Sequence, residues 1–453
     1  MFVCTSFYNL PKNEISSSID IFFKRFNLSM IAKKSNAQKS KGVPFLVLFS
    51  YLVTTIFSNR SAFRDFQLHH DDLSFSDKTF RNLLNNGKIN WQRFLILLSK
   101  SVIGFIRPLT NEDRKEVFIV DDSMYERLNA KNVELCGWQY DHANHKNKKG
   151  FRFLQLGWSD GNTFLPVAFS LLSSSKKVRE AGKVDHRTHS GRRKAQAQRK
   201  GTDVLVELLQ AALKEGITAN YVLFDSWFSS PKMFHALHKM KLHAVCMLKR
   251  SKKVYYRYHG EWVDVKTIFQ TEKKRRGRSR YLLSVSVESE MDGQVLPIKL
   301  VYVRNRNKRN DYLVLATTDI SLSEDEIIQL YGKRWAIEVY FKICKQHLRL
   351  SKYQGLSYDG IFAHTITVAV SYLILAVQHR EQTDERTMGE LFYLMIEELS
   401  DISFSEAISQ LLELFKEVFA NEMVLSEETL NNIMDQFLQK LPQATQNQLK
   451  LVA

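Results

Sequence analysis

The segment between residues 331 and 345 places a phenol, a guanidinium, a carboxylate and an ammonium group at fixed spacing. These groups belong to Tyr331, Arg334, Glu338 and Lys345. On a helix that turns about 100° per residue, the four side chains fall within an arc of roughly 60°. A carboxylate among cations suits a metal-bound phosphate, because the acid binds the metal and the basic groups bind the phosphate oxygens. A solvated helix with an incidental ion pair is the alternative, since Arg334 and Glu338 are four residues apart.

Aspartates follow two short apolar runs that predict buried strands. Residues 117–120 lead into Asp121 and Asp122, and residues 221–224 lead into Asp225. In open α/β sheets, functional sites gather at such strand ends. Adjacent residues of a strand point to opposite faces, so only one of Asp121 and Asp122 can join a site, and the position at the strand's exit favours Asp122. A turn or cap role is the alternative for each aspartate.

The carboxylates of Asp122, Asp225 and Glu338 form the predicted catalytic and metal-binding set. Oxygen ligands of this kind suit Mg²⁺ or Mn²⁺. A pair of such ions could activate water or a 3′ hydroxyl on one side of a phosphodiester and stabilise the leaving oxygen on the other. The sequence contains no Gly-x4-Gly-Lys-Ser/Thr phosphate loop, so we expect no use of ATP.

The order of the expected elements predicts an α/β fold. Five strands are expected at 117–122, 151–158, 163–172, 221–225 and 244–248, with a helix at 203–215 before the fourth of them. Alternating and β-branched stretches between residues 252 and 312, one of them at 262–269, predict a β-rich insertion. The run Ser323-Glu-Asp-Glu326 is a capping-box pattern and predicts the start of the helix that carries Glu338.

This reading divides the chain into five parts. They are a helical N-terminal DNA-binding region at 1–112, the first part of the catalytic core at 113–250, the β-rich insertion at 251–315, the rest of the core with the Glu338 helix and the following helix at 316–380, and an acidic helical region at 381–453. For the first region, a plain helical scaffold is the alternative, because no helix-turn-helix motif is evident.

Composition points to a nucleic-acid partner and a reducing compartment. The formal net charge is +17 and the pI is near 9.5, which favours a polyanion. Four widely spaced cysteines argue against a disulfide framework and a cysteine zinc site. No secretory signal is evident, and the apolar runs 45–57 and 361–377 read as buried helices, so we expect no membrane association and a cytoplasmic, nucleoid-associated protein.

Two basic segments are candidates for contact with DNA phosphates. Residues 176–200 hold ten Lys or Arg against two acids and read as a flexible arm, which includes Arg192, Arg193 and Lys194. The second segment lies between two strands of the insertion and includes Arg275 and Arg276. A solvated, disordered loop is the alternative for the first segment.

These motifs together resemble the DDE transposases of bacterial insertion sequences, in the group with a Tyr-x2-Arg-x3-Glu-x6-Lys signature. Tyr331, Arg334, Glu338 and Lys345 match that signature without a change of spacing. The segment Val-Asp-Asp-Ser ending at residue 123 resembles the first-aspartate motif, and residues 224–228 resemble the second. The resemblance covers roughly residues 115–378.

The resemblance implies a ribonuclease H-like catalytic core with a β-rich insertion, flanked by helical N- and C-terminal regions. It further implies two Mg²⁺ ions, with Mn²⁺ as a substitute, held by Asp122, Asp225 and Glu338. Contacts with terminal phosphates are implied for Tyr331, Arg334 and Lys345, and we add Lys342 of the same helix. Members that form a DNA hairpin stack a flipped base on a tryptophan, for which Trp262 and Trp227 are candidates; core packing is the alternative.

The expected function is therefore metal-dependent transposition. The protein would bind the terminal inverted repeats of an insertion sequence, cleave the strands and join them to target DNA, in some members through a hairpin. The resemblance implies a homodimer, because two DNA ends must be held together. One alternative is a ribonuclease H-like nuclease that does not join strands. The other is a transposase-derived DNA-binding regulator that no longer cuts.

Overall fold

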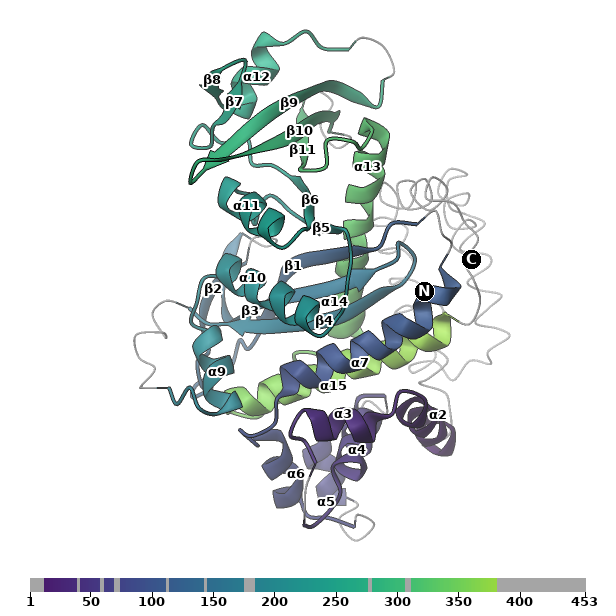
Figure 1. Ribbon diagram of the computed structural model, residues 1–453. Helices are drawn as coiled ribbons and strands as arrows, with labels where there is room; N and C mark the ends of the chain where they lie inside the picture. The colour runs from purple at the N-terminus through teal and green to yellow at the C-terminus, as the bar shows by residue number, and fades with distance from the viewer. Residues whose placement is uncertain are drawn as a thin grey trace, which may run out of the picture. The chain divides into compact units, whose positions relative to one another are not determined.

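The predicted aspartates lie within or directly after strands of one mixed sheet. The computed structural model describes residues 12–38, 41–57, 61–68, 74–110, 114–141, 145–174, 184–275, 279–305 and 311–380. These residues form a mixed α/β architecture around one eleven-stranded sheet (Figure 1). The strand order is β2-β3-β1-β5-β6-β11-β10-β9-β7-β8, and β4 pairs with β3.

The five predicted strands of the core are all present. They are β1 (Val117–Glu126), β3 (Lys146–Ser159), β4 (Phe164–Leu172), β5 (Tyr221–Phe224) and β6 (His243–Met247). The first three are antiparallel neighbours, whereas β5 and β6 run parallel to β1. An additional strand, β2 (Gly137–Asp141), pairs with the beginning of β3. Every residue of β4 and β5 is buried, which explains their continuous apolar sequences.

Helices provide the connections to the parallel strands. The predicted helix before β5 is α10 (Gly201–Lys214), and α11 (Pro231–Lys239) joins β5 to β6. The backbone N–H of Met233 donates to the Ser230 hydroxyl at 3.2 Å, and Pro231 occupies the first turn, where its missing N–H costs nothing. The basic segment 176–200 is only partly a loop, because α9 (His189–Gln196) forms within it.

The insertion extends the central sheet rather than standing apart from it. Its elements are β7 (Tyr256–Tyr258), β8 (Glu261–Val263), α12 (Val265–Thr271), β9 (Tyr281–Met291), β10 (Gln294–Arg304) and β11 (Tyr312–Thr317). Strand β11 pairs antiparallel with β6. The strand predicted at 262–269 is wrong, because Asp264 accepts hydrogen bonds from the backbone N–H groups of Lys266 and Thr267 and starts a helix there.

Helices fill the described part of the N-terminal region. They are α2 (Lys12–Arg25), α3 (Leu28–Lys34), α4 (Phe45–Phe57), α5 (Ala62–Leu68), α6 (Asp77–Leu84), α7 (Trp91–Ile106) and the 3₁₀ turn η2 (Arg107–Leu109). The last long helix, α7, packs against β4, where the Ser99 hydroxyl donates to the carbonyl of Pro166 at 2.7 Å. This region is therefore joined to the sheet through α7.

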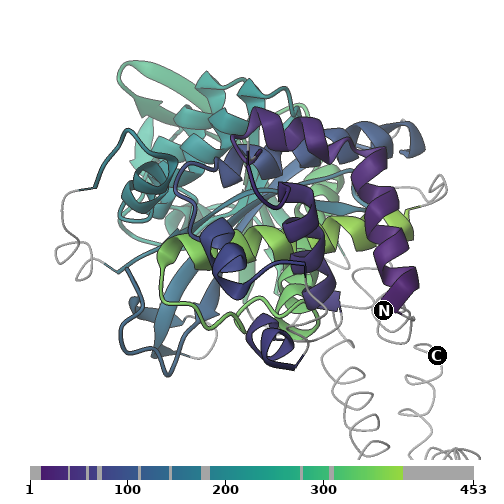
Figure 2. The same ribbon diagram turned by 90° about the horizontal axis from the view of Figure 1, so that it is seen from below.

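The helix α15 (Tyr358–His379) is long and apolar enough to cross a membrane by length and composition. Its most apolar window is wholly buried inside the protein, and it packs against α4, α6, α7 and β4 (Figures 1 and 2). The prediction of a buried helix for residues 361–377 is confirmed. The acidic region predicted at 381–453 lies outside the described residues.

A buried histidine in α15 makes stability depend on pH. Burial lowers the pKa of His364 to about 4, and its Nε2 lies 3.0 Å from the carbonyl oxygen of Arg349. A folded-state pKa below the unfolded value of about 6.5 means that the neutral ring is favoured by folding. Its contribution is complete above pH 6.5 and is lost as pH falls toward 4, by about 3 kcal/mol in total.

We therefore expect the free energy of unfolding to fall between pH 6.5 and 4 by about 3 kcal/mol more in the wild type than in His364→Gln. Urea titrations at pH 7, 5.5 and 4.5 measure this difference. Equal slopes for the two proteins would mean that folding does not lower the pKa of His364.

Candidate active site

Both candidate aspartates lie inside β1 rather than at its exit. The antiparallel pairing with β3 continues through Asp121–Gln155 and Asp122–Leu154 as far as Glu126–Gly150. The predicted end of this strand at residue 122 is therefore wrong, because the ladder supplies backbone partners for four more residues. The argument from the strand's exit no longer chooses between Asp121 and Asp122, and the direction of the side chains must decide.

Asp121 shares a face of the sheet with Asp225. The last pair that joins β1 and β5 is Ile119–Leu223. Asp121 lies two residues further along β1, and Asp225 lies two residues further along the chain, directly after β5. Residues at matching levels of parallel strands point to the same side. The charge of Asp225 accordingly acts on Asp121. The carboxylate of Asp225 also accepts a hydrogen bond from the backbone N–H of Trp227 at 2.8 Å, which fixes the turn after β5.

The signature segment is not one continuous helix, as predicted, but two helices joined by a 3₁₀ turn. Helix α13 (Glu324–Gly332) begins at the expected capping box, in which Ser323 and Glu326 bond reciprocally. The turn η3 (Lys333–Trp335) and helix α14 (Ala336–Gln346) follow. Within η3, the Lys333 side chain is buried and donates to the carbonyl of Lys115 at 2.7 Å. This bond anchors the turn against the residues that precede β1.

Arg334 joins the late helix to β1. Its Nη1 lies 2.7 Å from Asp121 Oδ2, and its Nη2 lies 2.5 Å from Glu338 Oε1. The guanidinium carbon is 5.8 Å from the centre of the Tyr331 ring. Arg334 and Asp121 are each only 16% exposed, so solvent screens this bridge weakly. One guanidinium therefore holds two of the candidate acids in one place.

The pKa of Asp121 reflects both its burial and the charged side chains around it. Burial raises the pKa of Asp121 to about 7; Arg334 opposes the rise, whereas the charges of Asp225 and Asp122 add to it. Burial also raises the pKa of Tyr331 to about 12, so the phenol keeps its proton at neutral pH. A further cation placed among these carboxylates would favour their ionised form.

Asp122 has a different environment. Its Oδ2 lies 3.3 Å from Nε of Arg152 on β3. The guanidinium of Arg152 lies 4.7 Å from the centre of the Trp227 ring, and Nζ of Lys249 lies 4.3 Å from the same ring. The indole is 41% exposed, so it stands at the surface between two cations. Asp122 thus belongs to an ionic and aromatic cluster beside Asp225, not to the Arg334 bridge.

The sequence reasoning missed Arg152 and Lys249. A signal for Arg152 was available, because it is the one cation within the apolar run 151–158. Lys249 carries no such signal, since the preceding strand and the turn after it bring it to Trp227 only in the fold. A buried bond was missed as well, in which the Tyr340 hydroxyl lies 3.2 Å from Gln155 Oε1 and ties α14 to the strand beside Asp121.

The remaining predicted residues of α14 and of the insertion are spread more widely. Lys345 donates to the Ser123 hydroxyl at 2.6 Å, and burial lowers its pKa against the opposing charges of Glu126 and Asp141. Lys342 is half-buried on the same helix. Of the residues predicted in the insertion, Trp262 on β8 is 53% exposed. Arg275 is also exposed, and its guanidinium lies 4.5 Å from the centre of the Tyr281 ring. Arg276 lies outside the described residues.

The three basic residues predicted on the arm differ in their exposure. Arg192 is exposed and donates to the backbone carbonyl of His186. Arg193 is only 6% exposed and forms an ion pair with Asp359 at 2.6 Å. Lys194 pairs with Glu134 at 2.6 Å. Of the three, Arg192 alone presents an exposed side chain to a partner.

A metal-ion site is not ready-made in the part of the chain that the structure describes. No group of three or more His, Cys, Asp or Glu side chains there is arranged to hold a metal ion. The donors nonetheless fit a hard cation, because Asp121, Asp225 and Glu338 offer only oxygen. Burial raises the pKa of Asp121, the charges of Asp225 and Asp122 raise it further, and a divalent cation would favour the ionised carboxylate. Arg334 now supplies that neutralising charge between Asp121 and Glu338.

A family model of DNA-cutting enzymes matches part of the chain. Residues 68–289 match the family model described as DDE superfamily endonuclease. The match covers slightly under half of the chain; it includes both candidate positions on β1 and Asp225 but ends before Glu338. The matched segment is therefore similar to DDE superfamily endonucleases.

A solved transposase is among the structures to which the chain is similar. The chain resembles the cryo-EM structure of the piggyBac transposase synaptic complex with hairpin DNA, at 14% sequence identity and a TM-score of 0.41, over 95% of this chain and 84% of that one. A TM-score of 0.41 does not establish a shared fold. No curated protein sequence matches the chain.

Proposed function

We propose that the protein is a DDE transposase that binds the terminal inverted repeats of an insertion sequence. It cleaves the DNA strands at the ends of the element and transfers them to target DNA. The observation that carries this proposal is the bridge in which Arg334 holds Asp121 and Glu338 together, with the charge of Asp225 acting on Asp121. The family match and the net charge of +17 support it.

A ribonuclease H-like core is part of the proposal. The order β4-β3-β1-β5-β6, with three antiparallel strands followed by two strands parallel to β1, supports this fold. Helix α14 contacts β1, and the turn η3 that precedes it contacts β5, which supports the same arrangement. The division of the chain at residues 112, 250, 315 and 380 remains our proposal for its domains.

Asp121, Asp225 and Glu338 are the proposed ligands of two Mg²⁺ ions, for which Mn²⁺ would substitute. Asp121 replaces the predicted Asp122, because Asp121 has the shared face and the bond to Arg334. When bound, the ions would activate the attacking oxygen and stabilise the leaving one. Asp122 instead holds Arg152 beside Trp227, where the cation and the indole face the DNA strand that leaves the site.

The cations of the late helix hold the phosphate backbone. Arg334 presents a planar set of donors that matches phosphate oxygens, and divalent ions at Asp121 and Glu338 would free it from those carboxylates. Tyr331 keeps its proton and would donate a hydrogen bond to a phosphate oxygen. Lys345 stays ordered through Ser123, close to the proposed path of the backbone. Two copies of the chain hold the two ends, in the bacterial cytoplasm and without ATP.

The test measures strand cleavage and joining on linear DNA that carries the ends of the flanking element. We expect Mg²⁺-dependent nicks at the element end and joined or hairpin products from the wild type, and none with EDTA or with Glu338→Gln. Asp225→Asn should lose cleavage and keep binding. Glu290→Gln, which changes an exposed carboxylate on β9 in the same way, serves as the matched control and should cleave normally.

The outcomes separate the alternatives. Cleavage without joined products under any condition would indicate a ribonuclease H-like nuclease. Binding of the ends without cleavage, and with Asp225→Asn indistinguishable from the wild type, would indicate a DNA-binding regulator.

A further inference from the structure

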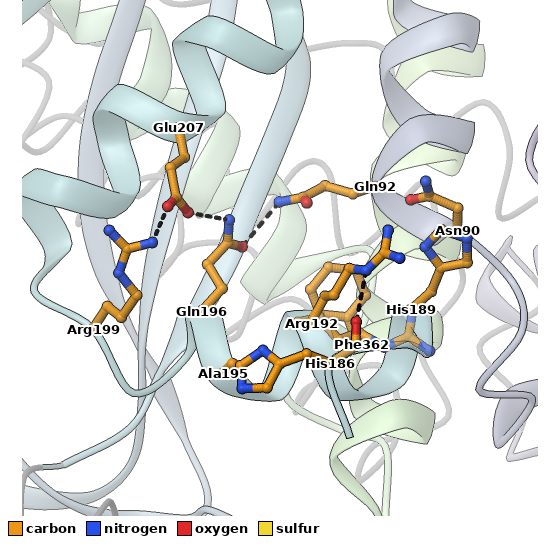
Figure 3. A pocket seen from close by; sticks show the side chains of 11 residues that line it. Asn90, Gln92, His186, His189, Arg192, Ala195, Gln196, Arg199, Glu207 and Phe362 are labelled. Atoms are coloured by element: carbon orange, nitrogen blue, oxygen red, sulfur yellow. Dashed lines mark hydrogen bonds and ion pairs between the residues drawn. The ribbon is translucent and has the colours of Figure 1, made fainter. Parts of the chain in front are cut away.

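A cavity separate from the candidate acids lies among α7, α9, α10 and α15. Its volume is about 360 Å³, within the range of ligand pockets, and side chains from all four helices or their caps line it (Figure 3). It lies on the β4 side of the sheet, because α7, α9, α10 and α15 all contact β4. Strand β3 separates β4 from β1, the strand that carries Asp121, and no residue of the pocket lining belongs to β1, β5 or α14.

The lining of the pocket is strongly cationic. Its guanidinium groups belong to Arg192, Arg193 and Arg199, and among its described residues Glu207 is the single carboxylate. Glu207 is already engaged, because it forms an ion pair with Arg199 and accepts a hydrogen bond from Gln196 Nε2 at 3.2 Å (Figure 3). Arg193 is paired with Asp359, which lies outside the lining, so Arg192 is the guanidinium of the lining for which no ion pair is found among the described residues.

Arg193 is held so that one of its donors is left over. Its Nε donates to Asp359 at 2.6 Å, and its Nη1 donates to the carbonyl of Ile89 at 3.0 Å. Its Nη2 is buried and has no hydrogen-bond partner among the described residues. A buried N–H without an acceptor destabilises a fold, because the group has lost its hydrogen bonds to water. An anion in the pocket would relieve this cost.

The neighbouring His189 adds no positive charge to the pocket at neutral pH. Burial lowers the pKa of His189, and the charges of Arg192 and Arg193 lower it further. The ring is therefore neutral at pH 7 and adds no charge of its own. Arg192 donates through Nε to the carbonyl of His186 at 2.9 Å, which holds its guanidinium at the pocket wall (Figure 3).

We propose that this pocket binds a phosphate group. Several guanidinium donors around one small cavity suit a tetrahedral anion with acceptors in all directions better than a single carboxylate. The phosphate is not the scissile one, because the pocket lies among helices that contact β4 and shares no lining residue with the candidate acids. It comes either from the DNA backbone or from free phosphate, and only the first source rests on the proposed function.

The first arm of the test titrates inorganic phosphate into the full-length protein by calorimetry. We expect binding by the wild type and a loss of about tenfold in affinity for Arg192→Gln, which removes a charged donor. Glu207→Gln should bind phosphate several-fold more tightly, because Arg199 loses its competing carboxylate. A misfolded protein would not gain affinity, so tighter phosphate binding by Glu207→Gln cannot be explained by misfolding. Lys214→Gln, an exposed charge loss on α10 outside the pocket, should be unchanged.

The second arm measures how the affinity for duplex DNA depends on salt. A lost backbone contact lowers the slope of log affinity against log salt by about 0.9. A lower slope for Arg192→Gln identifies the DNA backbone as the source; an unchanged slope with lost phosphate binding identifies free phosphate. The proposal is overturned if the wild type binds no phosphate and the slope is unchanged, or if Arg192→Gln and Glu207→Gln both bind like the wild type. Phosphate binding by a protein that cuts no DNA would refute the proposed function alone.

Discussion

Asp121→Asn is expected to lower the rate of Mg²⁺-dependent strand cleavage on the order of 10²–10³-fold, whereas Asp122→Asn should lower it only several-fold. The reason is that Asp121 shares the face of Asp225 and is bridged by Arg334 to Glu338. Asp122 is bonded to Arg152, so its loss disturbs a neighbouring cluster and leaves the three acids in place.

Both variants keep the shape of the side chain, so each is tested as a folded protein. The measurement is the single-turnover rate on a duplex that carries the element end, with thermal unfolding as a control for structure. A second readout is the affinity for Mg²⁺, measured by calorimetry. This affinity should weaken in Asp121→Asn and persist in Asp122→Asn. The reverse ranking in both assays would restore Asp122 as the first ligand.

Arg334→Met is expected to lower the free energy of unfolding by about 3 kcal/mol in metal-free buffer. The substitution keeps the volume of the side chain but leaves the carboxylates of Asp121 and Glu338 without the charge that balances them. Arg334→Lys should fall between the two, because an ammonium group keeps the charge but cannot bridge two carboxylates with a planar fork. Mg²⁺ should raise the melting temperature more in Arg334→Met than in the wild type, because the ions then supply the missing charge.

Urea unfolding with EDTA and with Mg²⁺ measures both effects. Arg187→Met is the matched control, since Arg187 forms an ion pair with Asp185 while its own side chain is 91% exposed, and we expect no measurable change there. If Arg334→Met unfolds like the wild type in EDTA, the bridge does not hold the acids together. If Mg²⁺ stabilises both proteins equally, Arg334 and the metal do not share the same carboxylates.

Much of the core was predictable because its signals are local. Apolar runs such as 117–120 and 221–224 must be buried somewhere, and the Ser323 capping box and Pro231 mark helix starts by backbone chemistry alone. The strand wrongly predicted at 262–269 shows the limit of such signals. An alternating pattern over eight residues gave way to Asp264, whose side chain bonds the first turn of a helix.

The end of β1 was not predictable from its own residues. A strand continues for as long as a neighbour offers backbone partners, and β3 offers them as far as Glu126. The same holds for the 3₁₀ turn at Lys333, where a buried bond to the carbonyl of Lys115 interrupts a sequence with helical periodicity. Both features depend on segments distant in the chain.

The sequence by itself determined the chemical groups of this protein: the four residues of the signature, an aspartate at the end of β5, an aspartate pair on β1 and an excess of positive charge. These groups can be identified without a structure, because residue types and their spacing are given by the covalent sequence. The tertiary structure alone decided that Asp121 rather than Asp122 meets Arg334, that Arg193 is buried and Arg192 exposed, and that Arg152 and Lys249 meet at Trp227. Side-chain direction, burial and ion pairing follow from the register and packing of distant strands and helices, which no local pattern encodes.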